Sequence, residues 1–237
     1  MTYEELKIQL DLNEPINVLK SVGRQTDDND WFIVCDDGDY HLFDNNGNEI
    51  NIKKIKSLKK DLISKDIKKI IVPNSITKIE NNTFFDCTKL KSISIPDSVK
   101  SIGDNAFAFC ENLTSINIPN SVKNIGDWTF EYCEKLTSII ISDSVKGIGN
   151  STFYSCKNLT LVNIPDSVKS IGDIAFTKCE KLKSITIPDS VKNIGNHTFV
   201  GCTNLKSMAF KGKTINQVKS MEDYPFGIKD ESIIRCI

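Results

Sequence analysis

Six cysteines are the residues of this chain whose type and spacing most invite a chemical interpretation. They recur at intervals of 23 residues, as Cys87, Cys110, Cys133, Cys156, Cys179 and Cys202. Metal sites favour close pairs such as Cys-x-x-Cys, and no such pair occurs here. Thiols stacked in parallel also have poor geometry for disulfide bonds. Because cysteine is small and often buried, the spacing predicts a column of reduced structural thiols and no metal site.

Histidines and paired acids offer no stronger catalytic candidates. The chain has 2 histidines, His41 and His197, and neither has an evident catalytic companion. Asp36 and Asp37 precede a glycine and are expected to form a turn, not an acid–base pair. No nucleophile-elbow, phosphate-binding-loop or His-Glu-x-x-His motif occurs. The sequence therefore predicts a protein that is not an enzyme and that uses no cofactor.

The charge balance argues against several classes of partner. Lysine and arginine number 30 against 31 aspartates and glutamates, a formal net charge of −1, whereas nucleic-acid-binding proteins carry a basic excess or stripe. No stretch approaches the roughly 20 apolar residues that cross a bilayer. We therefore expect neither a nucleic acid nor a membrane as partner.

The first residues bear on where the protein works. Residues 1–7 contain two acids and no apolar run, unlike a secretory signal peptide. This favours a cytoplasmic location, in which the cysteines stay reduced. Secretion or display at the cell surface is the alternative, if a leader precedes these residues.

The cysteine interval is the period of an internal repeat, because other residue types keep step with it. The leucine and phenylalanine columns are Leu90, Leu113, Leu136, Leu159, Leu182 and Leu205, and Phe84, Phe107, Phe130, Phe153, Phe176 and Phe199. A serine column keeps the same interval. Chance does not hold several residue types in step over such a length, so the chain is a stack of similar coils.

Residues 110–132 show how one repeat is expected to fold. Leu113, Ile116 and Ile118 follow one another at spacings of three and two and should point inward from a short strand. Pro119 cannot donate to a strand ladder, so the strand should end there. A single coil of this kind cannot bury its apolar face, whereas stacked coils bury it on both sides. The strands of successive coils are therefore expected to form a parallel sheet.

The second half of the repeat is expected to turn the chain back to the next strand. Gly126 should supply a turn conformation that side chains resist. Asp127 should cap a short helical turn, and Phe130 should fill the interior. Counting a degenerate first coil and a last one from Cys202, the sequence predicts seven coils.

The pattern C-x-x-L-x-x-I-x-I-P-x-S-V-x-x-I-G-x-x-x-F resembles the BspA-like class of bacterial-type leucine-rich repeats, over about residues 64–224. The resemblance implies an α/β repeat solenoid that is right-handed, β-rich and capped at both ends. Each coil would contain a short strand of one parallel β-sheet, turns and a short helical segment. Members of this class are often described as surface adhesins or interaction proteins.

The chain divides into three parts at the ends of the repeat. Residues 1–63 do not match it and are expected to be an N-terminal cap of short helices (2–12 and 15–22) and a β-hairpin (31–35 and 40–43). A separate effector or docking module is the alternative. Residues 64–210 form the array of 23-residue units, and residues 211–237 form a C-terminal cap.

The candidate binding site lies at exposed strand positions in the middle of the array. Outward positions of strands line the usual binding face of a solenoid, and here most of them are small and polar. Ile140 and Leu161 break this rule on neighbouring strands and predict a hot spot for a protein partner. Ordinary surface hydrophobes are the alternative. The polar residues around the two complete the candidate site: Ser115, Asn117, Ser138 and Asn163.

Two further surfaces leave their interpretation open. An aromatic set at the coil edges (Phe109, Trp128, Tyr132 and Tyr154) either binds a partner or packs between coils. Columns of lysine and of aspartate, which follow the repeat three residues apart, either solvate a face or recognise a charged groove.

These features together predict a non-catalytic protein–protein interaction module, a monomer that binds a protein through the strand face. An inhibitor or effector of a host protein is one form of this function. A surface-adhesive or self-assembling structural protein is the alternative.

Overall fold

The computed structural model describes the strands 31–34, 40–43 and 49–50, and residues 57–60, 63, 65, 69–72, 74 and 76–237. The helices expected at 2–12 and 15–22, and the acids Asp36 and Asp37, lie outside the described residues. Strand β2 (Tyr40–Phe43) pairs antiparallel with β1 (Trp31–Val34) and with β3 (Glu49–Ile50).

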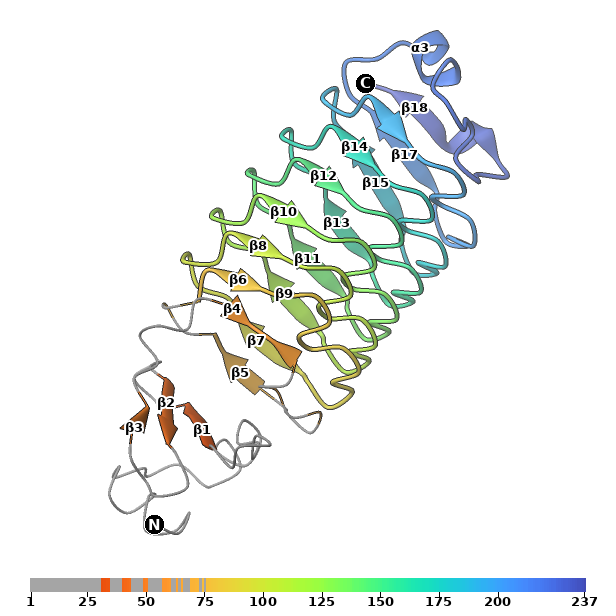
Figure 1. The fold of residues 1–237 in the computed structure, drawn as a ribbon. Coiled ribbons are helices and arrows are strands. Elements are labelled where there is room, and N and C mark those ends of the chain that lie inside the picture. Colours follow the sequence, from red (N-terminus) through yellow and green to blue (C-terminus); the bar gives the residue numbers. More distant parts are fainter. Residues whose placement is uncertain are drawn as a thin grey trace.

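The array is a β-solenoid whose coils stack one on another from residue 57 to the C-terminus (Figure 1). One face is formed by a row of parallel strands, most of which the sequence predicts before a proline. They pair at an offset of 23 residues, except for the last pair, where the offset is 26. Ile139, for example, pairs with Ile116 on one side and Val162 on the other. The strands of this row, called the first sheet below, are β5 (Lys69–Ile71), β7 (Ser92–Ser94), β9 (Ser115–Asn117), β11 (Ser138–Ile140), β13 (Leu161–Asn163), β15 (Ser184–Ile187), β17 (Ser207–Phe210) and β18 (Ile234–Cys236). Hydrogen bonds join them in three groups, β5–β7, β9–β11–β13 and β15–β17–β18.

A second row of parallel strands runs along the array beside the first (Figure 1). The sequence spacing predicts only that Val122 and Ile125 point inward from this part of the repeat, and it does not predict a sheet here. Each strand has two residues, of which the isoleucine or leucine is buried and the other points outward. The strands are β4 (Ser57–Leu58), β6 (Lys78–Ile79), β8 (Ser101–Ile102), β10 (Asn124–Ile125), β12 (Gly147–Ile148), β14 (Ser170–Ile171) and β16 (Asn193–Ile194).

The core between the two sheets is a set of columns of identical side chains. The phenylalanine column from Phe84 to Phe199 is buried throughout. Its rings stack with centroids 5.0–5.6 Å apart and interplanar angles between 0° and 14°. Each ring between the two ends of the column therefore packs against two others, and the stability of one coil depends on its neighbours.

The segment that follows each strand of the second sheet turns the chain and is called the corner below; residues 126–132 are one example. The expected helical segment is not formed there, because residues 127–132 are turns. In each corner the backbone is left-handed two residues before and two residues after the buried phenylalanine, with φ between 51° and 63° at the non-glycine positions. A continuous helix cannot accommodate such residues.

The left-handed residues align peptide groups with the axis of the stack. The N–H groups of Trp128, Phe130 and Tyr132 donate to carbonyls of the following coil at 2.8, 2.9 and 2.8 Å. The carbonyls of the residues just before them accept from the preceding coil. The same three bonds join each pair of successive coils from residue 82 to residue 200. Three columns of hydrogen-bonded peptide groups, the corner columns, therefore run along the array.

Two predicted roles in the corner are corrected by this geometry. Asp127 does not cap a helical turn: its Oδ1 accepts from the backbone N–H of Asn150 in the next coil, at 2.8 Å. Gly126 has no positive φ. It is required because a Cβ there would lie 2.3 Å from Oδ1 of Asp104 and 2.5 Å from the backbone nitrogen of the same residue. The glycine thus permits a close approach of two coils.

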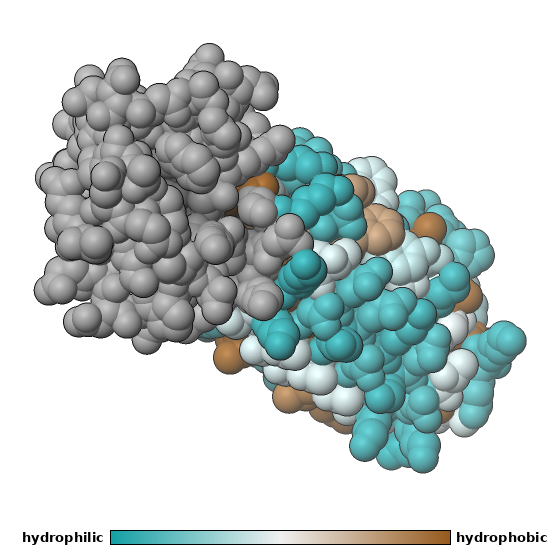
Figure 2. Space-filling model, turned by 90° about the horizontal axis from the view of Figure 1, so that it is seen from below, coloured by the Kyte–Doolittle hydropathy of each residue, from teal (hydrophilic) through white to brown (hydrophobic). Residues whose placement is uncertain are grey.

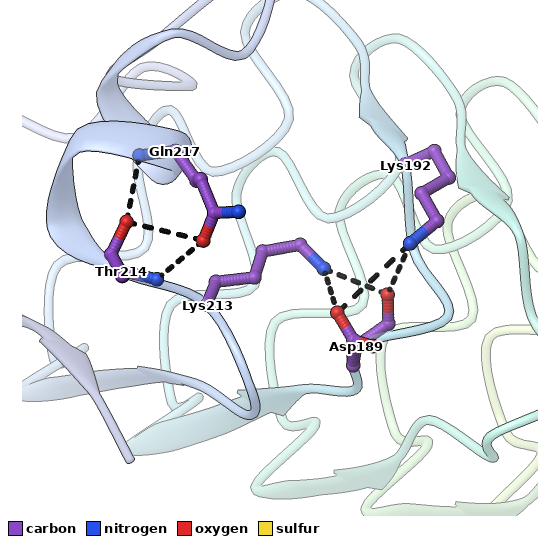
Figure 3. Close-up of polar contacts among 5 residues, drawn as sticks. All are labelled: Asp189, Lys192, Lys213, Thr214 and Gln217. Carbon is purple, nitrogen blue, oxygen red and sulfur yellow. Dashed lines mark hydrogen bonds and ion pairs between the residues drawn. The ribbon is translucent and has the colours of Figure 1, made fainter.

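The C-terminal region after β17 contains helix α3 (Ile215–Lys219) and the short 3-10 helix η3 (Glu231–Ile233). Thr214 and Gln217 form a capping box at the start of α3 (Figure 3). Beside it, Nζ of Lys213 lies 2.9 Å from Oδ1 of Asp189 and 2.7 Å from the Asp189 carbonyl oxygen. The Lys213 side chain is only 10% exposed. These contacts tie the C-terminal region to the turn after β15.

Candidate interaction surface

All six residues of the predicted binding site lie on three neighbouring strands of the first sheet. β11 pairs with β9 and with β13, so that Ser138 lies between Ser115 and Leu161, and Ile140 lies between Asn117 and Asn163. The alternation of buried and outward residues places all six on the outer face. The structure therefore brings the predicted residues together in one area.

Ile140 and Leu161 are exposed by 64% and 62%. They lie on adjacent strands but at different positions along them, because Leu161 pairs with Ser138 and not with Ile140. The two side chains are therefore diagonal neighbours. Such neighbours on a sheet are about 7–8 Å apart, close enough for one partner side chain to contact both.

The threonines that precede β9, β11 and β13 have hydroxyls that already bind acceptors. The hydroxyls of Thr137 and Thr160, just before β11 and β13, each donate to the carbonyl of the threonine one coil earlier, at 3.1 Å. Thr114 does the same towards the carbonyl of Lys91, at 3.3 Å. In the coil after Thr160 the same position holds Lys183, which is exposed. Lysines hold the same position before β7 (Lys91) and before β15 (Lys183), on the two sides of these three threonines.

The face of the array seen from below is mostly hydrophilic or neutral, with hydrophobic side chains at its margins (Figure 2). Large exposed hydrophobics are few among the residues whose burial the structure describes. They are Trp128, Ile140, Leu161, Val200, Ile215 and Ile237. Ile140 and Leu161 are the pair among them that shares neighbouring strands of one sheet.

Three of the four residues of the aromatic set at the coil edges pack between coils. Phe109 stacks on Tyr132 at 4.8 Å between centroids, and Tyr132 meets Tyr154 edge-on at 5.3 Å. Phe85, which the sequence analysis did not include, extends this column at 5.3 Å from Phe109. Nζ of Lys178 lies 5.1 Å from the ring centroid of Tyr154. These ring faces are therefore occupied by neighbours and are not free to stack on a ligand.

Trp128 does not belong to that column. It occupies a left-handed corner position, with φ 55°, and is exposed.

The Tyr154 hydroxyl accepts from Nζ of Lys178 at 2.8 Å, and this bond lowers the pKa of Tyr154. No sequence signal indicated this tyrosine–lysine contact, because its partners lie one coil apart.

The cysteine column is structural. The thiols of Cys133, Cys156 and Cys179 are buried, and each donates to the carbonyl oxygen of a phenylalanine one coil earlier, at 3.1–3.2 Å. Burial raises the pKa of these thiols well above the ordinary value. At the end of the column, burial raises the pKa of Cys202 to about 12. Nucleophilic chemistry requires a thiolate, so these cysteines are inert.

His197 is the one remaining catalytic candidate whose side chain the structure describes. His197 is exposed at a corner position, and the side chain of His41 lies outside the described residues. Among the residues that the structure describes, no group of three or more histidines, cysteines and acids is placed to hold a metal ion. No helix within that part of the chain is long and apolar enough to span a bilayer.

A column of alternating lysine and asparagine was not recognised in the sequence, because its period is two coils. The position two residues after each cysteine holds lysine and asparagine alternately, as Lys89, Asn112, Lys135, Asn158, Lys181 and Asn204. Nζ of Lys135 donates to Asn112 at 2.6 Å, and Nζ of Lys181 donates to Asn158 at the same distance. The alternation keeps like charges two coils apart.

The family follows from this repeat and from its match to known proteins. The model of the BspA type leucine rich repeat region matches the chain in six copies, over residues 60–179 and 129–229. The chain belongs to the BspA-type leucine-rich-repeat family.

Two solved structures show how similar this BspA-type protein is to known ones. The T. pallidum leucine rich repeat protein (TpLRR) is 31% identical, with a TM-score of 0.61, over 64% of this chain and 72% of that one. A leucine rich cell surface protein from Faecalibacterium prausnitzii A2-165 is 29% identical, with a TM-score of 0.62. That match covers 79% of this chain and 54% of the other, so this chain spans about half of it. No curated protein matches.

Proposed function

We propose that this BspA-type repeat protein is a non-catalytic protein-binding module whose binding face is the first sheet, centred on Ile140 and Leu161. The observation that supports this is the exposure of the two side chains, 64% and 62%, on a face that is otherwise small and polar. Complete burial of such a side chain is worth about 1.5–3 kcal/mol. The pair would act as the apolar centre of an interface, and Ser115, Asn117, Ser138 and Asn163 would form its polar surroundings.

Affinity capture from lysates of the source organism and of its host, read by mass spectrometry, tests the proposal. The wild type is compared with an Ile140→Asp, Leu161→Asp double variant. The control is Asn124→Asp with Ser170→Asp, which adds the same charge at exposed outward positions of the second sheet. We expect a partner that the wild type and the control retain and the double variant loses. A partner that all three retain equally would place the binding face elsewhere.

Inhibition of a host protein is the form of this function that suits a small array without catalytic residues. A module of this kind acts by covering a surface of its partner. The captured partner would therefore be assayed with and without the protein, and an activity lowered by the wild type and not by the double variant is expected.

A surface-adhesive role is the second candidate, and one relative favours it. The Faecalibacterium prausnitzii protein of similar fold is named a cell surface protein, and this chain spans 54% of it. Cell fractionation with light scattering separates the two functions. Protein in the cytoplasmic fraction that stays monomeric supports the binding module, whereas protein at the cell surface, or concentration-dependent assembly, supports adhesion.

A further inference from the structure

The C-terminal end of the array is sealed less completely than its interior. Leu205, the last residue of the leucine column, is 8% exposed, whereas the five before it are 0% exposed. Cys202 is also partly exposed, although the earlier cysteines of its column are buried. Both residues line a cavity of about 510 Å³ that lies between the last coil and residues 227–233.

A backbone donor at this cavity lacks the partner that its counterparts have. In the preceding coil the N–H of Lys178 donates to the carbonyl of Val200 at 2.8 Å. That carbonyl and the N–H of Gly201 belong to one planar trans peptide group, so they point in opposite directions. The Gly201 N–H therefore points out of the array towards the C-terminal region. Among the described residues it has no hydrogen-bond acceptor, and Gly201 lines the cavity.

The neighbouring corner column shows which chemical group fits such a donor. The N–H of Phe199 occupies the equivalent place in the middle column and donates to the carbonyl of Phe226 at 3.0 Å. In all earlier corners the donors of the three columns bind backbone carbonyls, whereas at this last corner the N–H groups of His197 and Gly201 have no acceptor among the described residues. Of these two residues, Gly201 lines the cavity. The last N–H of the column that ends at Gly201 therefore lacks only a carbonyl oxygen as its acceptor.

The walls of the cavity define the rest of the occupant. Phe199, Leu205, Ile228 and Ile233 supply apolar surface, and the volume lies in the range of about 300–1,000 Å³ that is typical of ligand sites. Lys229 and Asp230 also line the cavity, and the Asp230 carboxylate accepts a hydrogen bond from the Ser232 N–H, at 3.0 Å. Their opposite charges favour neither an anion nor a cation, so a neutral carbonyl group is the acceptor that matches the Gly201 N–H.

We propose that this cavity binds an apolar residue of an extended partner peptide. The backbone carbonyl of that residue accepts from the Gly201 N–H, and its side chain packs against Leu205, Ile228 and Ile233. The peptide would continue the corner column by one step, as the next coil does elsewhere in the array. The site lies at the end of the array, away from Ile140 and Leu161, so it goes beyond the proposed function and does not depend on it.

Titration of the full chain with N-acetyl-phenylalanine amide, followed by ¹H–¹⁵N NMR, tests the proposal. We expect a downfield shift and slower solvent exchange of the Gly201 amide, together with shifts of residues 227–233. The comparison ligand is ethylbenzene, which has the ring but no hydrogen-bond acceptor. It should bind about two- to tenfold more weakly, as the loss of one hydrogen bond predicts, and should leave the Gly201 amide exchange unchanged.

A matched pair of variants locates the site. Thr203 is exposed and lines the cavity, and Glu180 is exposed at the same position of the preceding coil, outside the cavity. Thr203→Trp should weaken binding of the capped amino acid by about tenfold or more, while Glu180→Trp should change it by about twofold at most. An unchanged HSQC pattern elsewhere shows that both variants fold.

Three results would overturn the proposal: a Gly201 amide that does not respond at saturation, equal affinity for ethylbenzene, or equal affinity in the Thr203→Trp variant. The Ile140→Asp, Leu161→Asp variant should bind the capped amino acid like the wild type. Its behaviour in this titration therefore separates failure of the end cavity from failure of the strand face.

Discussion

Along the strand face, the outward position changes from Ser115 to Ser138 to Leu161 in successive coils without any change in strand pairing. In the corner, the side chains are restricted by the backbone of the neighbouring coils. Gly126 leaves room for Asp104, and Asp127 accepts from the next coil. The difference teaches that the regular residues of this repeat maintain coil stacking, whereas the strand face is free to vary and hence to acquire a partner.

The largest effect is expected in the phenylalanine column, on which both regions depend. Phe130 is fully buried, with ring centroids 5.4 and 5.6 Å away on either side. Phe130→Ala should lower the free energy of unfolding by about 3–5 kcal/mol, measured by urea denaturation. Tyr132→Ala, in the partly exposed aromatic column of the same corner, is the control and should cost clearly less. Equal losses would contradict the assignment of the core to the phenylalanine column.

A pair of glycine substitutions compares the corner with a strand directly. A Cβ at Gly126 would meet the Asp104 backbone nitrogen at 2.5 Å, whereas a Cβ at Gly147 in β12 would meet only Ser170, with its Oγ at 3.2 Å. Gly126→Ala should destabilise the fold by about 2–4 kcal/mol, because two coils must move apart. Gly147→Ala should change stability by about 0.5 kcal/mol at most. A similar melting temperature for both variants would show that the corner tolerates a side chain.

The left-handed corner positions predict a stabilising substitution. Ile174 has φ 60°, a conformation that costs a residue with a Cβ about 1–2 kcal/mol. Asn82 and Asn105 occupy the same position in earlier coils. Ile174→Asn should therefore raise the unfolding free energy by about 0.5–1 kcal/mol, while Ile174→Val, which stays β-branched, should not. Thermal melts of both would decide, and a gain with valine would argue against backbone strain.

The coil at β11 departs from the repeat at Ser142, where the neighbouring coils have Pro119 and Pro165. The Ser142 hydroxyl is buried and has no hydrogen-bond partner. The carbonyl at this position accepts from a valine in all three coils, at 3.0–3.2 Å, so the local turn is the same. Ser142→Pro should stabilise the protein by about 1 kcal/mol through a stiffer unfolded chain and removal of the unpaired hydroxyl. Ser142→Ala removes only the hydroxyl and should give a smaller gain in calorimetry.

The smallest effect on stability is expected on the strand face. Ile140→Asp with Leu161→Asp should change the free energy of unfolding by about 0.5 kcal/mol at most, because both side chains are already exposed. A large loss of stability would mean that the pair is part of the structure and would remove the argument for a binding face.

Sequence spacing alone was sufficient to predict the repeat period, the columns of inward-pointing residues and the outward placement of Ile140 and Leu161. These follow from the two-residue alternation of a strand and from the 23-residue period, both of which are local patterns. The diagonal placement of the two side chains could also have been read from the sequence by aligning Ser138 with Leu161.

The second sheet, the corner columns and the cavity at Gly201 were decided only by the tertiary structure. Two-residue strands such as Asn124–Ile125 carry too little alternation to be recognised. The left-handed residues that align the corner peptides include tryptophan, isoleucine and lysine, for which no local preference predicts that conformation. Hydrogen bonds to the next coil fix their backbone geometry, and at the last corner of the array the Gly201 N–H has no next coil to bind.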